Sequence, residues 1–550
     1  MATTPIKQLL ARTFKSACLE QCEQVKLLTF SFPQSPYKYG IRTSVHLLIF
    51  WGLERCEASG KFSFEVHHMF SDVVKQTLGF DDLVPENGSL EYFKVLAHRD
   101  RFIRGRGLAS NNEETPLTSI GSNLTLALNF LGFLHYANVS VGTPATWFLV
   151  ALDTGSDLFW LPCNCGTTCI HDLKDARFSE SVPLNLYTPN ASTTSSSIRC
   201  SDKRCFGSGK CSSPESICPY QIALSSNTVT TGTLLQDVLH LVTEDEDLKP
   251  VNANVTLGCG QNQTGAFQTD IAVNGVLGLS MKEYSVPSLL AKANITANSF
   301  SMCFGRIISV VGRISFGDKG YTDQEETPLV SLETSTAYGV NVTGVSVGGV
   351  PVDVPLFALF DTGSSFTLLL ESAYGVFTKA FDDLMEDKRR PVDPDFPFEF
   401  CYDLSPNVTT PVEMIFVGGS KMTLRNPFLT ATSKEGTKMY CLGILKSINL
   451  NIIGQNLMSG HRIVFDRERM ILGWKQSNCF EDESLASESP PPPEIEAPPP
   501  SVSTPPPAAS ATPPTIDPRN STRNSGTGGA ANLSPLAAQL LFLLPLLAFL

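Results

Sequence analysis

The tetrapeptide Asp-Thr-Gly-Ser occurs twice in this chain of 550 residues, and a short apolar run precedes each copy. The runs are residues 148–152 and 356–360. The motif residues are Asp153, Thr154, Gly155, Ser156, Asp361, Thr362, Gly363 and Ser364. A given four-residue string occurs by chance roughly once in 10⁵ positions, so two copies after strand-like runs indicate a shared chemical role.

Two aspartates held against each other can act as an acid and a base together. Like charges at contact distance share one proton, so the ionised member can draw a proton from a water while the protonated member polarises a carbonyl group. Threonine offers a hydroxyl, glycine permits close backbone approach, and serine can hold the outer carboxylate oxygen. The alternative is that each Asp-Thr-Gly is only a turn after a strand. The duplication favours the catalytic interpretation.

Each aspartate motif is followed, about one lobe-length later, by two apolar residues and a glycine. These triplets are Val276-Leu277-Gly278 and Ile452-Ile453-Gly454. With these motifs the sequence resembles the pepsin-like aspartic endopeptidases, and more closely their atypical, nepenthesin-like plant branch, from Tyr136 to Cys479. The resemblance implies two β lobes with the active cleft between them, and a catalytic pair formed by Asp153 and Asp361 around a shared water. It implies a polypeptide substrate, with no cofactor and no metal.

The pattern of the body between the two ends of this resemblance agrees with a β fold. Short runs rich in Val, Ile, Leu, Phe and Thr alternate with Gly, Pro, Asn and Ser, which predicts strands and turns. Residues 136–142 are echoed by residues 338–348, each ahead of its own aspartate motif, so two similar lobes are expected. Helices are expected to be few, with one at 371–387. We therefore predict an all-β, bilobal pepsin-like aspartic protease fold, large enough for two cores.

The expected domains follow one another along the chain. They are a leader at 1–59 with a signal-peptide-like segment at 44–59, a pro-segment at 60–130, an N-terminal catalytic lobe at 131–327, a C-terminal catalytic lobe at 328–482, a Pro/Ser-rich stalk and spacer at 483–535, and an apolar tail at 536–550. The apolar run 45–53 has the build of a signal peptide, although it begins late, and the alternative is a buried strand. The basic stretch 98–106 resembles a pro-segment that brings positive charge near the aspartates, and the alternative is a solvated charged face.

One position departs from the family pattern. In pepsin-like enzymes a hairpin flap over the cleft carries a tyrosine, and Leu224 stands where that tyrosine is expected. Tyr220 lies four residues earlier, on the same face of a strand. Either Tyr220 takes over through a shifted flap or the flap closes with an apolar contact. We expect slower or more selective cleavage, because a flap orients the substrate and excludes water.

The number of cysteines and the net charge indicate the compartment of this protein and the partners that it does not bind. Twelve of the 15 cysteines fall between residues 136 and 479, and this even number predicts disulfides in an oxidising compartment. The alternative for the cluster 163–218 is a zinc site with His171. By resemblance, the cluster is a Cys-rich insertion after the first motif, and Cys401 pairs with Cys441. The net charge of −13 argues against a nucleic-acid partner.

The C-terminal end predicts attachment to a membrane surface. Residues 484–518 are rich in Pro, Ser, Ala and Glu and should form a semi-rigid stalk. A small-residue stretch with Asn524 and Ser525, a polar spacer and an apolar tail have the layout of a glycosylphosphatidylinositol (GPI) anchor signal. The tail is too short for a spanning helix. With recurring Asn-x-Ser/Thr sequons, this predicts a glycosylated monomer that reaches the cell surface through the secretory pathway and is anchored by a lipid or extracellular.

Two function classes follow from these observations. The first is an aspartic endopeptidase that hydrolyses extended peptides in extracellular or cell-surface proteins, with an acid pH optimum. The second is a non-catalytic pepsin-fold protein that acts as a binding or inhibitor module at the cell wall. Intact motifs in both lobes favour the enzyme, and the missing flap tyrosine favours the alternative.

Overall fold

The computed structural model describes residues 60–78, 85–105 and 133–479, apart from internal gaps, and of residues 101–105 it describes only the backbone. The gaps are 174–181, 225–226, 245–247, 269–271, 273, 306–310, 333–334, 384, 386–388, 393–395, 404–411, 425–426 and 434–435. The signal-peptide-like segment, the stalk, the anchor candidates Asn524 and Ser525 and the tail lie outside the described residues. No helix in the described ranges combines the length and hydropathy that a membrane crossing requires.

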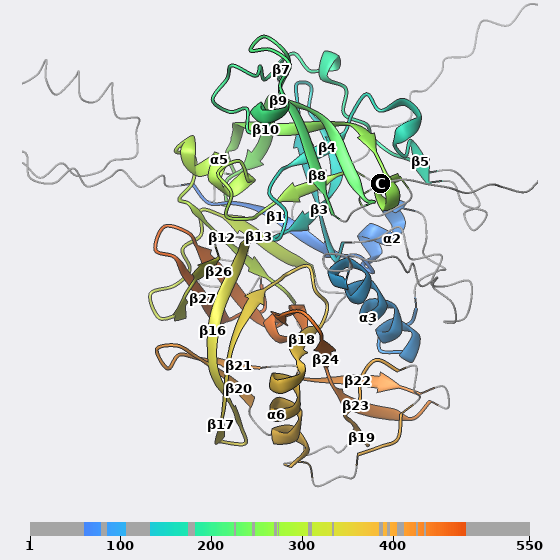
Figure 1. The fold of residues 1–550 in the computed structure, drawn as a ribbon, viewed down its shortest axis with the longest axis vertical. Coiled ribbons are helices and arrows are strands. Elements are labelled where there is room, and N and C mark those ends of the chain that lie inside the picture. The colour runs from blue at the N-terminus through green and yellow to red at the C-terminus, as the bar shows by residue number, and fades with distance from the viewer. Residues whose placement is uncertain are drawn as a thin grey trace, which may run out of the picture. The chain divides into compact units, whose positions relative to one another are not determined.

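Strands dominate the described residues (Figure 1). Those of the first half are β1 (Phe62–His68), β2 (His135–Val141), β3 (Thr146–Asp153), β4 (Trp160–Pro162), β5 (Asp172–Leu173), β6 (Val182–Pro183), β7 (Ser196–Ser197), β8 (Pro219–Ala223), β9 (Val229–Val242), β10 (Pro250–Gln263), β11 (Val276–Gly278), β12 (Ser299–Cys303) and β13 (Gly312–Phe316). Those of the second half are β14 (Glu325–Pro328), β15 (Val330–Leu332), β16 (Ser335–Val347), β17 (Val350–Phe360), β18 (Thr367–Leu370), β19 (Cys401–Asp403), β20 (Val412–Phe416), β21 (Lys421–Thr423), β22 (Phe428–Thr432), β23 (Lys438–Leu442), β24 (Ile444–Ser447), β25 (Asn451–Ile453), β26 (His461–Asp466) and β27 (Ile471–Gln476). The predicted all-β class is therefore confirmed.

Helices are few and short. They are α2 (Asp72–Leu78), α3 (Leu90–Gly105), α5 (Val286–Lys292), α6 (Glu371–Asp382) and α7 (Gln455–Met458), with 3-10 turns η2 (Gly166–Thr168), η3 (Pro189–Ala191), η4 (Ser208–Lys210) and η5 (Gly265–Gln268). The helix predicted at 371–387 is thus present but ends earlier, at Asp382. Its buried residues recur at helical spacing along one face, which packs against the core.

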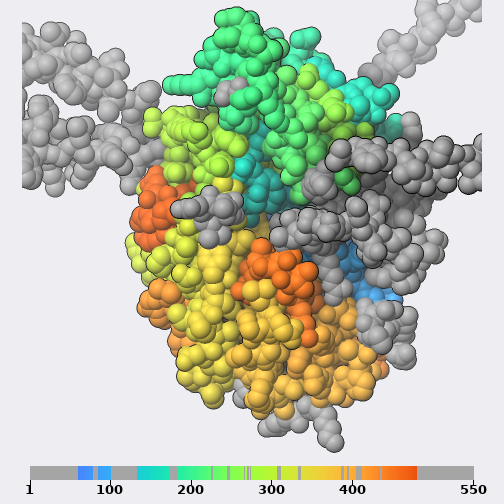
Figure 2. All heavy atoms as spheres, viewed as in Figure 1, coloured from blue at the N-terminus to red at the C-terminus, as the bar shows by residue number. Residues whose placement is uncertain are grey.

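The strands form two main sheets, and the smaller contains strands of the second half alone. The larger has the order β14-β27-β26-β12-β13-β1-β2-β3-β11-β4-β10-β9-β7, and the smaller has the order β21-β20-β16-β17-β25-β18-β24. The last strands, β26 and β27, return to the larger sheet, where β26 pairs with β12 and β27 pairs with β14. Figure 2 shows the same arrangement as a green end and a yellow-to-orange end, with the red-orange C-terminal strands beside lime-coloured residues. Residues 461–476 therefore join the second half to the first.

The predicted internal duplication is visible in the strand pairing. The β2–β3 hairpin leads into the first aspartate motif, and the β16–β17 hairpin leads into the second. Each leading strand is then joined in parallel by a later strand, β11 beside β3 and β25 beside β17. The last six residues of β3 are all buried, so both faces of the strand are covered, and this explains the continuous apolar run in its sequence.

The segment expected to be a pro-segment is built into this body. Its strand β1 pairs antiparallel with β13 and, at its end, with β2. Its helix α3 lies beside β22 of the second half (Figure 1). Residues 60–105 therefore contact both halves of the chain.

All twelve described cysteines are paired. The disulfides are Cys163–Cys259, Cys165–Cys169, Cys200–Cys211, Cys205–Cys218, Cys303–Cys479 and Cys401–Cys441. The last of these is the pair that the resemblance implied. The cysteines of the 163–218 cluster thus carry no free thiolate, which is the ligand that the zinc alternative needs.

Candidate active site

The two Asp-Thr-Gly-Ser loops meet at their threonines. Asp153 ends β3, and Asp361 directly follows β17. The hydroxyl oxygens of Thr154 and Thr362 lie 3.3 Å apart, although the residues are separated by 208 positions in the chain. Both aspartates are almost buried, with 5% and 7% of their surface exposed. The fold therefore joins the two predicted motifs, and each half contributes one carboxyl group.

Each aspartate is held by donors of its own motif. The backbone N–H of Gly155 donates to Oδ1 of Asp153 over 2.9 Å, and the hydroxyl of Ser156 donates to Oδ2. The second motif repeats this arrangement at Asp361, with distances of 2.9 Å and 2.7 Å. Glycine allows the amide to approach because it carries no Cβ, and serine holds the outer oxygen. Both carboxyl groups therefore have a fixed orientation, which proton transfer requires.

The glycine of each apolar triplet permits a strand to cross close behind a motif loop. A Cβ atom on Gly278 would lie 2.7 Å from the backbone of Asp157, and one on Gly454 would lie 2.3 Å from the carbonyl oxygen of Phe366. Real Cβ atoms do not tolerate such distances. These glycines are required by the parallel pairing that positions each motif, and the repeated triplet in the sequence has this steric cause.

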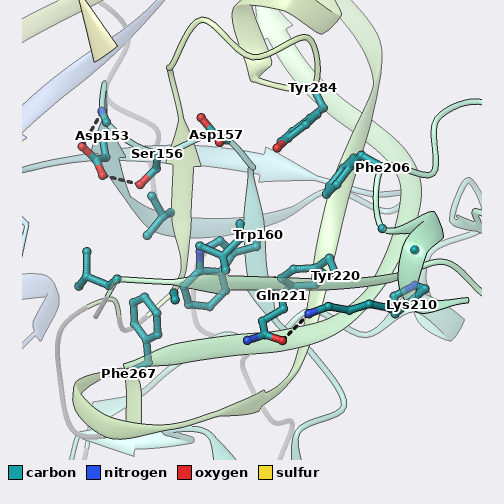
Figure 3. Close-up of a pocket in the computed structure, with 18 of the residues that line it drawn as sticks. Asp153, Ser156, Asp157, Trp160, Phe206, Lys210, Tyr220, Gln221, Phe267 and Tyr284 are labelled. Atoms are coloured by element: carbon teal, nitrogen blue, oxygen red, sulfur yellow. Dashed lines mark hydrogen bonds between the residues drawn. The ribbon is translucent and has the colours of Figure 1, made fainter. Parts of the chain in front are cut away.

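A cavity of about 640 Å³ opens beside the first motif (Figure 3). Asp153 lines it at one end, and the hairpin of β8 and β9 supplies one wall. Trp160, Tyr220 and Phe267 contribute aromatic surface between them. The cavity therefore combines a carboxyl group with several aromatic side chains, as expected of a site for an extended chain with bulky side chains.

The two flap candidates both face this cavity. Tyr220 is buried, and its hydroxyl oxygen lies 3.1 Å from the hydroxyl of Thr230. Leu224 is half-buried on the same face of the hairpin, whereas Gln221 and Ala223 between them are exposed. Tyr220 thus lies on β8 below the tip of the flap hairpin, and Leu224 supplies an apolar side chain nearer the tip.

Tyr220 owes its position to a glycine on the neighbouring strand. A Cβ atom at Gly258 would lie 2.7 Å from the Tyr220 ring. We therefore expect Gly258→Ala to displace the ring and to lower the free energy of unfolding by about 1–3 kcal/mol. Thermal unfolding would measure this change. The matched control is Gly209→Ala, because the added methyl group meets no atom within 4 Å. Equal stability of the two variants would contradict the prediction.

Two charged residues of α3 contact the second motif and the two residues that follow it. Asp100 is fully buried and accepts hydrogen bonds from the backbone N–H groups of Ser365 and Phe366, at 2.8 Å and 3.0 Å, and from the Ser365 hydroxyl at 3.0 Å. Arg99 forms an ion pair with Asp100 at 2.7 Å and donates to the carbonyl oxygen of Gly363 at 2.8 Å. The basic stretch 98–106 therefore reaches the second motif, but its acidic residue makes most of these contacts.

Buried histidines surround this ion pair. His68 ends β1 and His135 begins β2, and their ring centroids lie 5.7 Å apart. Burial lowers the pKa of His135 to about 3, and the positive charge of Arg99 acts in the same direction. Burial, with His135 and Arg99, also lowers the pKa of His68 well below its ordinary value. Its Nδ1 accepts a hydrogen bond from the backbone N–H of Phe70, which requires that nitrogen to carry no proton.

Sequence reasoning found both aspartates but missed several residues around them. Asp100 was missed because the stretch 98–106 contains several arginines, and its net positive charge predicted only a basic contact. Phe206 and Lys210 line the cavity from the Cys-rich insertion, and Tyr284 lines it from the loop before α5. The sequence signal for these residues was a lysine and an aromatic residue close to several cysteines. Only the disulfide pairing shows that the insertion folds back onto the flap hairpin.

The body of this chain is similar to known proteins. Family models described as xylanase inhibitor N-terminal and xylanase inhibitor C-terminal match residues 135–318 and 337–476. Aspartyl protease family protein 1 of Arabidopsis thaliana is 50% identical over 446 residues, which cover 80% of this chain and 86% of that protein. Aspartic proteinase-like protein 1 of the same plant is 37% identical over 439 residues, which cover 77% and 82%. The solved structure of soybean Basic 7S globulin aligns with a TM-score of 0.48 at 20% identity and covers 63% of this chain and 94% of that one.

Proposed function

The chain belongs to the xylanase-inhibitor-like branch of the pepsin-fold aspartic proteases, and from this premise we propose that it is an aspartic-type endopeptidase. The observation that carries the proposal is the meeting of two identical carboxyl loops, one from each half, at Thr154 and Thr362. Each loop holds its aspartate through one backbone N–H and one serine hydroxyl. The named relatives support peptidase activity at the level of the family.

In the proposed mechanism a water lies between Asp153 and Asp361, which share one proton. The ionised carboxylate takes a proton from the water as the oxygen attacks the peptide carbonyl, and the protonated carboxyl donates a hydrogen bond to the developing oxyanion. The C–N bond then breaks as the carboxyl that took the proton from the water gives it to the leaving nitrogen. The hydrogen bonds within each motif keep the two groups in place through the reaction. Tyr220 and Leu224 would cover the substrate and limit the access of water.

The test uses the purified full chain with an unfolded protein substrate between pH 3 and pH 7. We expect cleavage at acid pH, because the carboxyl pair must hold one proton, and we expect inhibition by pepstatin, a mimic of the tetrahedral intermediate. A folded chain that cleaves nothing across this range, both before and after limited proteolysis of the segment ahead of residue 131, would contradict the proposal. Stoichiometric inhibition of a xylanase by such a chain would support the alternative of a non-catalytic inhibitor, which the names of the family models favour.

We also propose that residues 60–130 form a pro-segment that keeps the enzyme latent. The contacts of Arg99 and Asp100 with the second motif support this proposal. Secretion to the cell surface and a GPI anchor near Asn524 or Ser525 belong to the same proposal, and their support is the sequence of residues 44–59 and 483–550. Glycosylation is supported by the Asn-x-Ser/Thr sequons, and an acid optimum by the need for the two aspartates to hold one proton.

Asp100 gives a test of how strongly α3 is held against the second half of the chain. We expect Asp100→Ala to destabilise the full chain by about 3–5 kcal/mol, because Arg99 would remain buried without its anion and two N–H groups would lose their acceptor. Urea unfolding would measure the change. Asp72→Ala is the matched control, since its ion pair with Lys75 lies at the surface. A similar midpoint for both variants would count against the proposed role of α3.

A further inference from the structure

Lys210 ends the short turn η4, inside the Cys-rich insertion. The disulfide Cys200–Cys211 anchors the residue that follows Lys210, and Cys205–Cys218 joins the insertion to the start of β8. The backbone of the insertion also packs against β8, since a Cβ atom on Gly207 would lie 1.9 Å from the carbonyl oxygen of Pro219. The insertion thus holds Lys210 beside the flap hairpin.

The ammonium group of Lys210 has a neutral partner. Its Nζ donates to Oε1 of Gln221 over 2.6 Å, and the described residues show no carboxylate in ion-pair contact with it. The acidic groups that line the cavity are Asp153 and Asp157. Figure 3 shows Asp153 and Lys210 at opposite ends of the view, and Asp157 accepts hydrogen bonds from Ser280 and Thr336 instead. Among the described residues that line the cavity, Lys210 is therefore the one cation, and it lies at the end away from the catalytic motif, in a chain with a net charge of −13.

Aromatic side chains form the walls between these two ends. Trp160 and Tyr220 lie in the middle of the view in Figure 3. Phe206 of the insertion stacks on Tyr284, with ring centroids 3.9 Å apart and an angle of 14° between the ring planes. This stack joins the insertion to the loop before α5. A peptide that enters the cavity would therefore place apolar side chains along the walls and a polar one against Lys210 and Gln221.

We propose that Lys210 forms a binding subsite for an acidic side chain of the substrate peptide, at a position displaced from the bond that is cleaved. The inference rests on the proposed endopeptidase function and names its specificity. A carboxylate would replace the Gln221 oxygen as the acceptor for Nζ, and hydrogen bonds between ionised partners are stronger than those to a neutral amide. The amide nitrogen of Gln221 would remain free to donate to the second carboxylate oxygen.

The test scans a glutamate through each position of a peptide with a central pair of bulky apolar residues, and compares every peptide with its glutamine counterpart. With the full chain at pH 5, we expect kcat/KM for glutamate to exceed that for glutamine by about 5-fold at one position. At pH 3 this preference should disappear, because a glutamate with a pKa of about 4.3 is then neutral. Lys210→Met should remove the preference, and Lys210→Glu should transfer it to a lysine peptide. Lys203→Met is the control, since Lys203 is an exposed lysine of the same insertion outside the cavity.

The outcomes separate this inference from the function on which it rests. Equal cleavage of glutamate and glutamine peptides by wild-type chain and by Lys210→Met would overturn the subsite while leaving the peptidase intact. If a folded chain cleaves no peptide, the proposed function fails. The ratio of the two Kd values, measured by fluorescence anisotropy on the same peptides, then decides the subsite. A ratio of 1 overturns it, and a preference that Lys210→Met removes supports it.

Discussion

Asp153→Asn and Asp361→Asn are each expected to lower kcat for peptide hydrolysis by roughly 10⁴-fold, the upper range for the loss of a positioned acid–base group. The amide of asparagine has nearly the same shape as the carboxyl group, so its oxygen can still accept the backbone N–H of Gly155 or Gly363. It cannot exchange a proton with a water. We therefore expect both variants to fold, bind peptide and remain almost inactive.

The measurement is single-turnover cleavage of one peptide at acid pH, with far-UV circular dichroism as the check on folding. Asp323→Asn is the matched control, because Asp323 is an exposed partner of Lys475 at the surface. The double variant should be scarcely slower than either single one, since the two carboxyl groups act as a unit. Full activity in both single variants would assign the cleavage to a contaminating protease.

Acidification is expected to destabilise the N-terminal segment steeply below about pH 6.5. The pKa values of His68 and His135 are lowered in the folded chain by burial. As the pH falls below about 6.5, the ordinary pKa of histidine, these histidines therefore bind protons in the unfolded chain but not in the folded chain. Each histidine then removes up to about 1.4 kcal/mol of stability per pH unit, until its folded pKa is reached. Burial also lowers the pKa of His67, which adds to the effect despite the opposing charge of Glu65.

Asp100 acts in the opposite direction. Burial raises the pKa of its carboxyl group, and Arg99 and the two backbone N–H donors reduce this rise. The folded chain therefore takes up this proton first, and this lessens the loss of stability at pH values near the raised pKa. The stabilising contribution comes from one carboxyl group, whereas the destabilising contributions come from two buried histidines on β1 and β2. The net effect of acid on the free energy of unfolding therefore remains destabilising.

Urea midpoints between pH 7 and pH 4 would test this prediction. His135→Gln should flatten the loss of stability by up to about 1.4 kcal/mol per pH unit relative to wild-type chain, because glutamine does not titrate. His171→Gln, at an exposed position, should leave the slope unchanged. An identical pH dependence in wild-type chain and His135→Gln would show that the buried histidines do not drive the transition.

Several parts of this molecule were predictable because their causes are local in sequence. Alternating short apolar runs determined the β class, since strands bury apolar side chains at a period set by the backbone. The duplicated Asp-Thr-Gly-Ser motif and the apolar triplets identified both aspartates. Their glycines are required by the close passage of β11 and β25 behind the motif loops. A steric requirement of this kind fixes one residue type at one position, and such a position can be recognised in the sequence.

Other parts depended on contacts between residues far apart in the chain. Which cysteines pair, and that Lys210 therefore lies beside the flap, follows from the three-dimensional path of the insertion. The burial of Asp100 against Ser365 and Phe366 joins positions more than 260 residues apart, and no local pattern encodes it. The sequence by itself determined which groups can perform the chemistry. Tertiary packing alone decided which other residues orient the two aspartates, line the cavity and contribute charge to it, because burial and proximity are properties of the folded chain.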